Sequence, residues 1–211
     1  MTERKSNYAM MAEAAQELFT QYDITEPITR LGFESDNEYL YIPFFGDRYT
    51  INRKTGEVCS PPEVLSAHTE RHGRSATFNA AMSIYDVICY SKPGAVLTGQ
   101  WRMLQGLSPH SNFRSAGGAG DFGKQAKHFS EHFDECLSRC EARGRRIDGK
   151  ADAEFEFDAF PFLPLLLRFW SADEEFPAKI DLLFDAGALD FIRFETAWYV
   201  GGYLMDLITG A

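Results

Sequence analysis

The sequence predicts an α+β fold, in which an antiparallel or mixed sheet packs against several helices. Three kinds of segment indicate it: apolar residues at helical spacing, short alternating runs rich in β-formers, and one continuous apolar run typical of a strand buried on both faces. A chain of 211 residues is also long enough to bury one sizeable core. We therefore expect residues 1–211 to form a single compact domain.

Four segments carry apolar residues at the spacing of one helix face. The pattern predicts an amphipathic N-terminal helix over 6–22, a second helix over 78–89, a long helix over 121–143 and a last helix over 195–208. Between them, residues 96–118 are punctuated by Gly, Ser and Pro. This stretch is expected to be a long irregular connection.

The strand signals fall in two groups. Residues 38–45 and 48–52 alternate in polarity, and a turn then returns the chain to residues 57–58, which predicts an antiparallel meander. Further on, residues 154–158 alternate Phe with acidic residues, as a half-buried strand does. Residues 165–170 are almost continuously apolar and are the candidate for a strand buried on both faces.

Charge and composition exclude several classes of function. The formal net charge is −10 and the sequence pI is near 5.0. Nucleic-acid affinity comes mainly from Lys and Arg neutralising phosphates, so we expect no nucleic-acid partner. No window approaches the ~18 apolar residues of a membrane span, so we expect no membrane association.

The N-terminus and the cysteines favour a cytoplasmic location. The first residues mix charges with a few apolar side chains and lack the apolar core of a signal peptide. The four cysteines have neither disulfide-framework spacing nor a C-x-x-C pair: Cys59, Cys89, Cys136 and Cys140. We expect them to be reduced thiols.

Five acidic residues gather beside the apolar strand: Asp173, Glu174, Glu175, Asp181 and Asp185. Carboxylates held against apolar surface could have raised pKa values suited to acid–base chemistry, or could bind a hard cation. The structural interpretation is that Asp173 and its neighbours end the strand and cap a helix beginning near Pro177. Helix N-termini favour negative charge and accept Pro at their first position.

Histidines and cysteines follow one another at four-residue spacing in the predicted long helix: His128, His132, Cys136 and Cys140. Each four-residue step drifts ~40° around a helix, so the set spans ~120° and ~18 Å, and one ion cannot touch all four. The cysteines share the apolar stripe and are predicted to be core thiols. The histidines could form a metal site with His68 and His72, which have the same spacing, or all four could be surface residues.

Two further segments could contact a ligand. Gly118 to Lys124 matches the G-x-x-x-x-G-K core of a phosphate-binding loop, but Gln125 replaces the Ser or Thr that would hold magnesium, so a flexible helix entry is favoured. Trp101 and Arg102 lie in the irregular connection and could present a stacking or anion-holding surface. The alternative for Trp101 is a plug in the core.

Several of these motifs occur in an order that resembles a known family. They are a helix ending in Tyr90, a G-x-W segment at Gly99, a P-x-x-P-L strand at Pro161, and D-E-E-F-P followed by L-F-D. The chain is similar to the uncharacterised prokaryotic family named domain of unknown function 3786, from about residue 30 to residue 211, most closely over 161–185.

The resemblance implies a setting rather than a mechanism. Such domains occur largely in anaerobic bacteria and archaea, and some are joined to a cysteine-rich iron–sulfur segment like that of corrinoid proteins. An association with corrinoid or iron–sulfur metabolism is what this implies. The cysteines of this chain lack the close clustering that cluster ligation needs.

Three functions follow as hypotheses. The leading one is a small-ligand-binding or accessory protein that holds a small molecule or a partner protein near the acidic turn and the Trp101 loop. Its expected contact residues are Trp101, Arg102, Asp173, Glu174, Glu175 and Asp185. The alternative is an enzyme that uses these acidic residues, with or without a divalent metal. The third is a homo-oligomeric structural module, and the sequence leaves the oligomeric state open.

Overall fold

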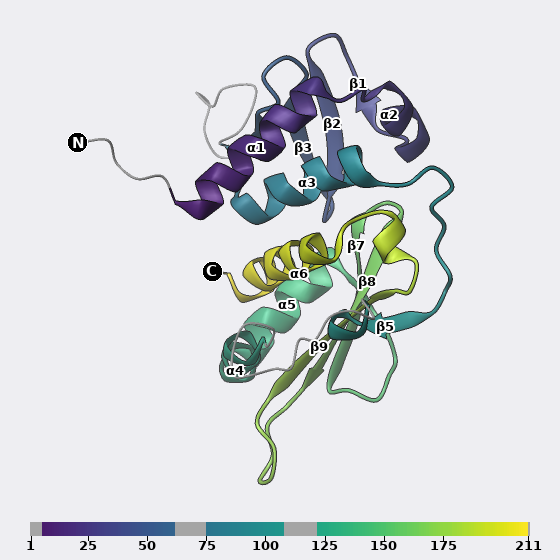
Figure 1. Ribbon diagram of the computed structural model, residues 1–211. Coiled ribbons are helices and arrows are strands. Elements are labelled where there is room, and N and C mark those ends of the chain that lie inside the picture. The colour runs from purple at the N-terminus through teal and green to yellow at the C-terminus, as the bar shows by residue number, and fades with distance from the viewer. Residues whose placement is uncertain (1–5, 62–74, 108–121, 211) are drawn as a thin grey trace, which may run out of the picture.

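A computed structural model describes residues 6–61, 75–107 and 122–210. Within these residues the chain forms six α-helices, two short 3-10 helices and nine strands in two antiparallel sheets (Figure 1). The α+β class predicted from the sequence is therefore confirmed. None of the helices in this part of the chain has the length and apolar character that crossing a bilayer requires.

The first part of the chain builds the smaller sheet and three helices. In chain order the elements are α1 (Asn7–Gln21), α2 (Thr25–Leu31), β1 (Glu34–Ser35), β2 (Tyr39–Phe44), β3 (Asp47–Asn52), β4 (Val58–Cys59) and α3 (Phe78–Tyr90). The strands follow the order β1-β2-β3-β4, so the predicted meander is confirmed. Helix α2 was not predicted, because its seven residues give too short a pattern.

The second part builds the larger sheet and the remaining helices. Its elements are β5 (Trp101–Met103), η1 (Leu104–Gly106), α4 (Gly123–Glu131), α5 (Phe133–Arg143), β6 (Arg145–Arg146), β7 (Ala153–Phe160), β8 (Leu163–Trp170), β9 (Lys179–Asp185), η2 (Ala188–Asp190) and α6 (Phe194–Thr209). The sheet has the order β5-β9-β8-β7-β6. Strand β5 lies inside the connection that was expected to be irregular, and the rest of that stretch beyond residue 107 is outside the described residues.

Strand β8 is the central strand predicted to be buried on both faces. Its odd-numbered residues face the helices, where the Phe169 ring stacks on Phe129 of α4 with centroids 4.3 Å apart. Leu166, on the opposite face of the pleat, is buried as well. Burial on both faces explains the near-continuous apolar run.

Two helix boundaries differ from the prediction. No helix begins near Pro177; the chain enters β9, because Ile180, Leu182 and Phe184 repeat every second residue and pair with β8. The helix expected over 121–143 is interrupted at His132, whose φ of −125° and ψ of 44° end α4 and begin α5. The apolar stripe nevertheless continues across the break.

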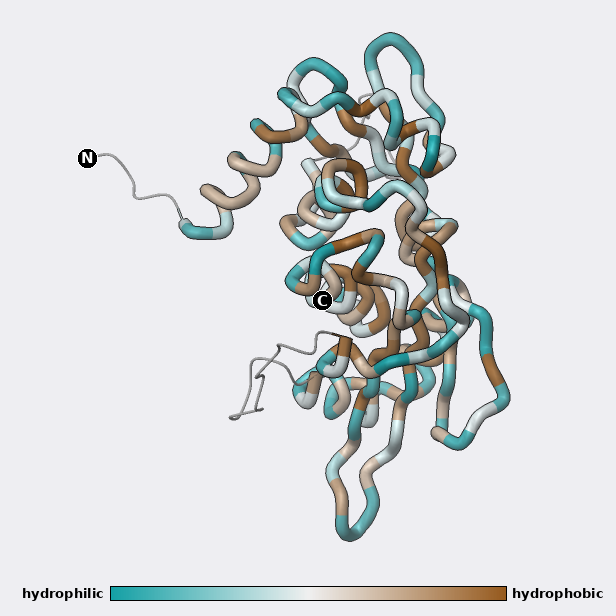
Figure 2. The backbone as a smooth tube through the Cα atoms, turned by 45° about the vertical axis from the view of Figure 1, so that its right-hand side comes forward, coloured by the Kyte–Doolittle hydropathy of each residue, from teal (hydrophilic) through white to brown (hydrophobic). Residues whose placement is uncertain are grey.

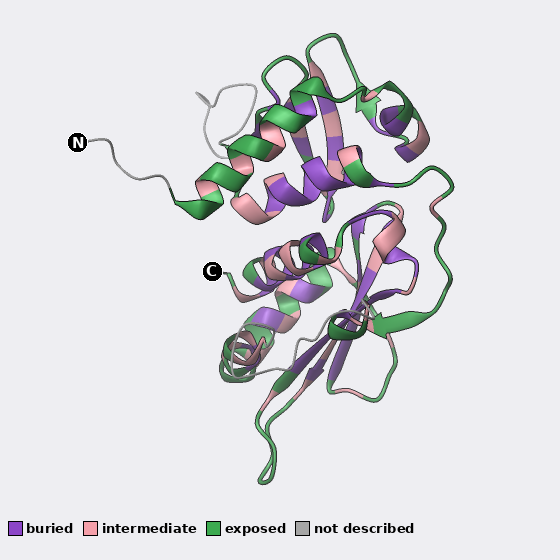
Figure 3. Cartoon of the chain, viewed as in Figure 1, coloured by how far each residue is buried: buried purple, intermediate pink, exposed green. Residues whose placement is uncertain are grey.

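The two sheets share one hydrophobic core, which lies between them and around α3 and α6 (Figures 1 and 3). Phe44 of β2 packs against Phe160 of β7 and Tyr203 of α6, with ring centroids 5.0 and 4.7 Å apart. The hydroxyls of Tyr49 and Tyr203 share a buried hydrogen bond of 2.7 Å. Polar and apolar contacts therefore join the two parts of the molecule.

Candidate functional site

A pocket of about 980 Å³ lies between α4 and the hairpin formed by β8 and β9. Residues of the hairpin, of α4 and of the loop before β7 line it. We call it the hairpin pocket, and the residues that matter most for its chemistry are Lys127, Asp152, Trp170, Asp173, Phe176 and Asp181. The acidic segment singled out in the sequence thus borders a large pocket.

The turn of the hairpin is fixed by Asp173. Its Oδ1 accepts hydrogen bonds from the backbone N–H groups of Glu175 and Phe176, at 2.8 and 2.7 Å. These two donors hold the pKa of Asp173 below its usual value. The residue therefore caps a turn between strands rather than a helix. The tip it shapes is hydrophilic and exposed (Figures 2 and 3).

The base of the hairpin carries a fixed group of charges. The indole Nε1 of Trp170 donates to Oδ2 of Asp181 at 3.2 Å, and Nζ of Lys179 lies 2.7 Å from Oδ1 of the same carboxylate. Asp152 accepts from the backbone N–H of Ser171 at 2.6 Å. Asp181 is 8% exposed, and Trp170 and Lys179 are the side chains that contact its carboxylate.

Glu174 and Glu175 are exposed at the tip and do not line the pocket. Asp185 lies at the other end of β9 and accepts four hydrogen bonds of 2.7–3.0 Å, from Thr98 N–H and Oγ1–H and from the N–H groups of Gly99 and Gly187. Burial alone would raise the pKa of Asp185, but these donors outweigh it and keep the pKa below the usual value. Its carboxylate is thus occupied in holding the chain together.

Trp101 and Arg102 form part of β5, where they pair with Asp185 and Phe184 of β9. Trp101 is 36% exposed. Since β9 has seven residues, its two ends are separated by roughly 20 Å. The structure therefore places the Trp101 segment and the acidic turn at opposite ends of one strand, and a small molecule in the hairpin pocket would not contact both.

The rings of His128 and His132 lie 4.4 Å apart at the break between α4 and α5. The predicted partners, His68 and His72, are outside the described residues, as are Gly118 to Asp121 of the loop-like segment. In the ranges that the structure describes, no three His, Cys, Asp or Glu side chains gather in a geometry that could hold a metal ion. The metal site remains a prediction.

Cys136 and Cys140 are fully buried, as predicted for core thiols. Burial raises the pKa of Cys140 to about 12 and also raises that of Cys136. Both side chains are therefore protonated at neutral pH and belong to the apolar stripe.

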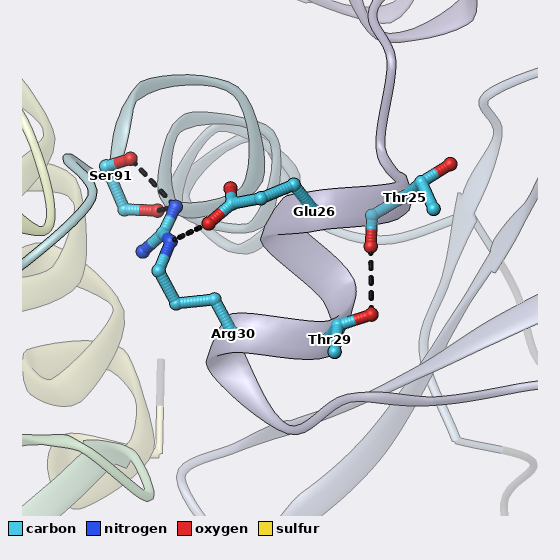
Figure 4. Close-up of polar contacts among 5 residues, drawn as sticks. All are labelled: Thr25, Glu26, Thr29, Arg30 and Ser91. Atoms are coloured by element: carbon cyan, nitrogen blue, oxygen red, sulfur yellow. Dashed lines mark hydrogen bonds and ion pairs between the residues drawn. The ribbon is translucent and has the colours of Figure 1, made fainter.

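A shallower hollow beside α2 is structural. Nε of Arg30 donates to Glu26 at 2.8 Å, and Nη2 donates to the carbonyl and hydroxyl of Ser91 at 2.9 and 3.1 Å (Figure 4). Ser91 is the C-cap of α3, so the guanidinium lies where the helix dipole favours a cation. Arg30 therefore ties α2 to α3 through contacts within the chain.

Sequence reasoning missed Lys127, Trp170 and Phe176 as pocket residues. Trp170 was read as the end of the buried run, and Phe176 as the start of the next apolar segment. Lys127 belongs to a helix whose approach to the hairpin depends on tertiary packing. The available signal was the aromatic pair flanking the acidic turn, Trp170 and Phe176, which the hairpin places on the same pocket.

The fold and the pocket define an α+β protein with two antiparallel sheets and an open site beside a hairpin. The family model described as "Domain of unknown function (DUF3786)" matches residues 23–207, so the chain belongs to this family. The match begins after α1. Searches of curated proteins and of solved structures found no match.

Proposed function

We propose that this protein binds a small ligand in the hairpin pocket and acts as a binding or accessory protein. The observation that carries the proposal is the pocket itself. Its volume of about 980 Å³ is at the upper end of the range typical of small-molecule sites. Its lining combines aromatic residues with a few charged ones, as such sites do.

The lining residues support a binding role. Phe176 is 66% exposed, and a large apolar side chain in water gains free energy when a ligand covers it. Trp170 is held by Asp181 at the hairpin base. Lys127, Lys179 and Asp181 supply charges of both signs that could fix a ligand's orientation.

Binding is favoured over acid–base catalysis by the state of Asp173. Its pKa is lowered by the turn amides, which makes it a weak base and an ionised carboxylate at neutral pH. The alternative, an enzyme that uses acidic residues, would rely on Glu131, Asp152 or Asp181 of the lining, and the last two accept hydrogen bonds within the fold. Turnover of a bound compound would support the enzyme alternative.

The test is a ligand search on protein purified without oxygen or chelator, by native mass spectrometry, elemental analysis and thermal shift. A retained compound or a stabilising one is expected. It should be lost in Ala178→Trp, which fills the pocket, and kept in Glu174→Gln, which changes a charge on the same hairpin outside the lining. A ligand that binds both variants equally would contradict the proposed site.

Further proposals accompany the binding role. We infer that residues 1–211 form one domain, that the protein is cytoplasmic, and that it has no nucleic-acid or membrane partner, in keeping with a net charge of −10. A link to corrinoid or iron–sulfur metabolism rests on the family resemblance. Retained cobalt or iron would support it, and native mass would give the oligomeric state and show any bound partner protein.

A further inference from the structure

A second, narrower groove of about 350 Å³ runs between α1 and α3. Most of its walls are apolar side chains at helical spacing on the two helices: Met11, Ala14 and Leu18 of α1, and Met82, Tyr85 and Cys89 of α3. We call it the helix groove. Ring contacts of Tyr8 with Phe78 and of Phe19 with Tyr85, at 5.0 and 6.0 Å, show that the helices run in the same direction.

One ion pair contributes to the lining of this apolar groove. Asp86 is 3% exposed and accepts hydrogen bonds from the backbone N–H and the Nε–H of Arg193. The Arg193 side chain is 52% exposed, and its guanidinium carbon lies 5.8 Å from the centre of the Tyr90 ring. The Nε contact fixes the guanidinium, while neither Nη group has a hydrogen-bond partner among the described residues.

The charges around Arg193 leave it able to bind an anion. Asp86 neutralises about one unit of charge, but Arg193 is also the N-cap of α6, and a helix N-terminus carries roughly half a positive charge. Glu195, in the first turn of α6, is exposed and does not line the groove. Two N–H-bearing groups of a fixed guanidinium match a carboxylate well.

The size of the groove favours a small molecule over a protein helix. Met11 and Leu18 are seven residues apart on α1, which gives the groove a length of about 10 Å. A helix with its side chains is itself ~10–12 Å wide and would not enter a volume of 350 Å³. An unbranched acyl chain is thin enough to lie between the two helices.

We propose that the helix groove binds a straight-chain carboxylate. The apolar chain lies along Met11 and Met82, and the carboxylate accepts hydrogen bonds from the Nη groups of Arg193. This site is independent of the hairpin pocket. One of its walls, α1, precedes the residues that match the family model.

Decanoate is the probe, with decanol and decylamine as matched neutral and cationic controls, all below their aggregation concentrations. In full-length protein carrying 13C-labelled methionine methyl groups, decanoate should shift Met11 and Met82 and leave Met103 of β5 unchanged. We expect decanoate to bind about tenfold more tightly than decanol, because a charge-assisted bidentate contact is lost in the alcohol. Decylamine should bind more weakly still.

Two variants test the geometry. Ala14→Phe fills the groove without touching the Asp86–Arg193 pair and should abolish the shift at Met82. Arg193→Lys should weaken decanoate about tenfold and leave decanol unchanged, since it removes the bidentate contact. Arg145→Lys, on the distant strand β6, is the matched control and should change nothing. Thermal unfolding first establishes that each variant is folded.

Three results would overturn the proposal: no shift at Met11 and Met82, equal affinity for decanoate and decylamine, or decanoate binding that survives Ala14→Phe. A concentration-dependent dimer that protects the same methionine methyl groups would also overturn it, because a second copy of the chain would then be the occupant. None of these results bears on the hairpin pocket.

Discussion

Strand β9 has an acidic residue near each end, and the two are held in different ways. At one end, Asp185 accepts three backbone N–H groups and the hydroxyl of Thr98. At the other, Asp181 contacts two side chains, Trp170 and Lys179, beside the hairpin pocket. Backbone donors are fixed by the fold, whereas side-chain donors can rearrange when a ligand arrives.

An acidic residue next to a core is therefore not in itself a sign of function. Whether such a carboxylate stabilises the fold or is available to a ligand depends on whether its partners are backbone amides or side chains. A carboxylate saturated by backbone amides stabilises a loop, and Asp185 joins the segment of Thr98 and Gly99 to the end of β9 in this way. A carboxylate held only by side chains at the edge of a pocket remains available to a ligand.

Removing the carboxylate of Asp185 should destabilise the protein more than any other change considered below. Asp185→Ala leaves the N–H groups of Thr98, Gly99 and Gly187 without their acceptor, and we expect the free energy of unfolding to fall by about 3 kcal/mol. Urea unfolding followed by circular dichroism measures it. A loss below about 1 kcal/mol would show that water replaces the carboxylate readily and would remove the contrast between the two ends.

Urea unfolding across a series of pH values tests the hydrogen-bond donors of Asp185 next. The pKa of Asp185 is lower in the folded protein than in the unfolded chain, so its contribution is fully present above the unfolded pKa of about 3.9. That contribution is lost as the pH falls through the folded pKa. Stability of Asp185→Asn should therefore decline less steeply in acid than that of the wild type.

A smaller change in stability is expected for Asp181→Asn. The amide oxygen can still accept from Trp170, and only the contact with the largely exposed Lys179 is lost, so stability should fall by about 1 kcal/mol or less. Affinity for a ligand of the hairpin pocket should fall by about tenfold if the charge contributes to binding. A large loss of stability with unchanged affinity would reverse the roles assigned to the two ends.

The smallest effect is expected at the hairpin tip. Glu174 is exposed and lies outside the pocket lining, so Glu174→Gln should change stability by less than about 0.5 kcal/mol. Ligand affinity should also be unchanged. A measurable loss of affinity would extend the site to the tip and bring Glu174 into it.

Much of the fold could be predicted because local patterns and burial agree. The segment over 78–89 has helical spacing and the meander alternates in polarity, so each pattern fits one kind of element. Strand β8 was recognised instead by its near-continuous apolar run. The segment after Asp173 was misjudged, since an acidic residue followed by Pro177 is typical of a helix start and equally of a turn. The alternation of Ile180, Leu182 and Phe184 was the better guide.

The candidate site was predicted only in part. Asp173 and Asp181 were in the acidic set, and both line the hairpin pocket. Asp185 and Trp101 lie at the other end of β9 from the acidic turn, a separation that depends on strand pairing and cannot be read from the sequence. The helix groove could not be foreseen, since its two walls are far apart in the sequence and Arg193 comes from a third element.

The burial of the native thiols has a practical consequence. Cys59, Cys89, Cys136 and Cys140 all have pKa values raised mainly by burial, and the thiolate is the form that reacts with alkylating reagents. A cysteine introduced at position 174 would be exposed and would react much faster than these four. The protein thus accepts a single fluorescent or spin label at the tip of the hairpin without prior removal of its own cysteines.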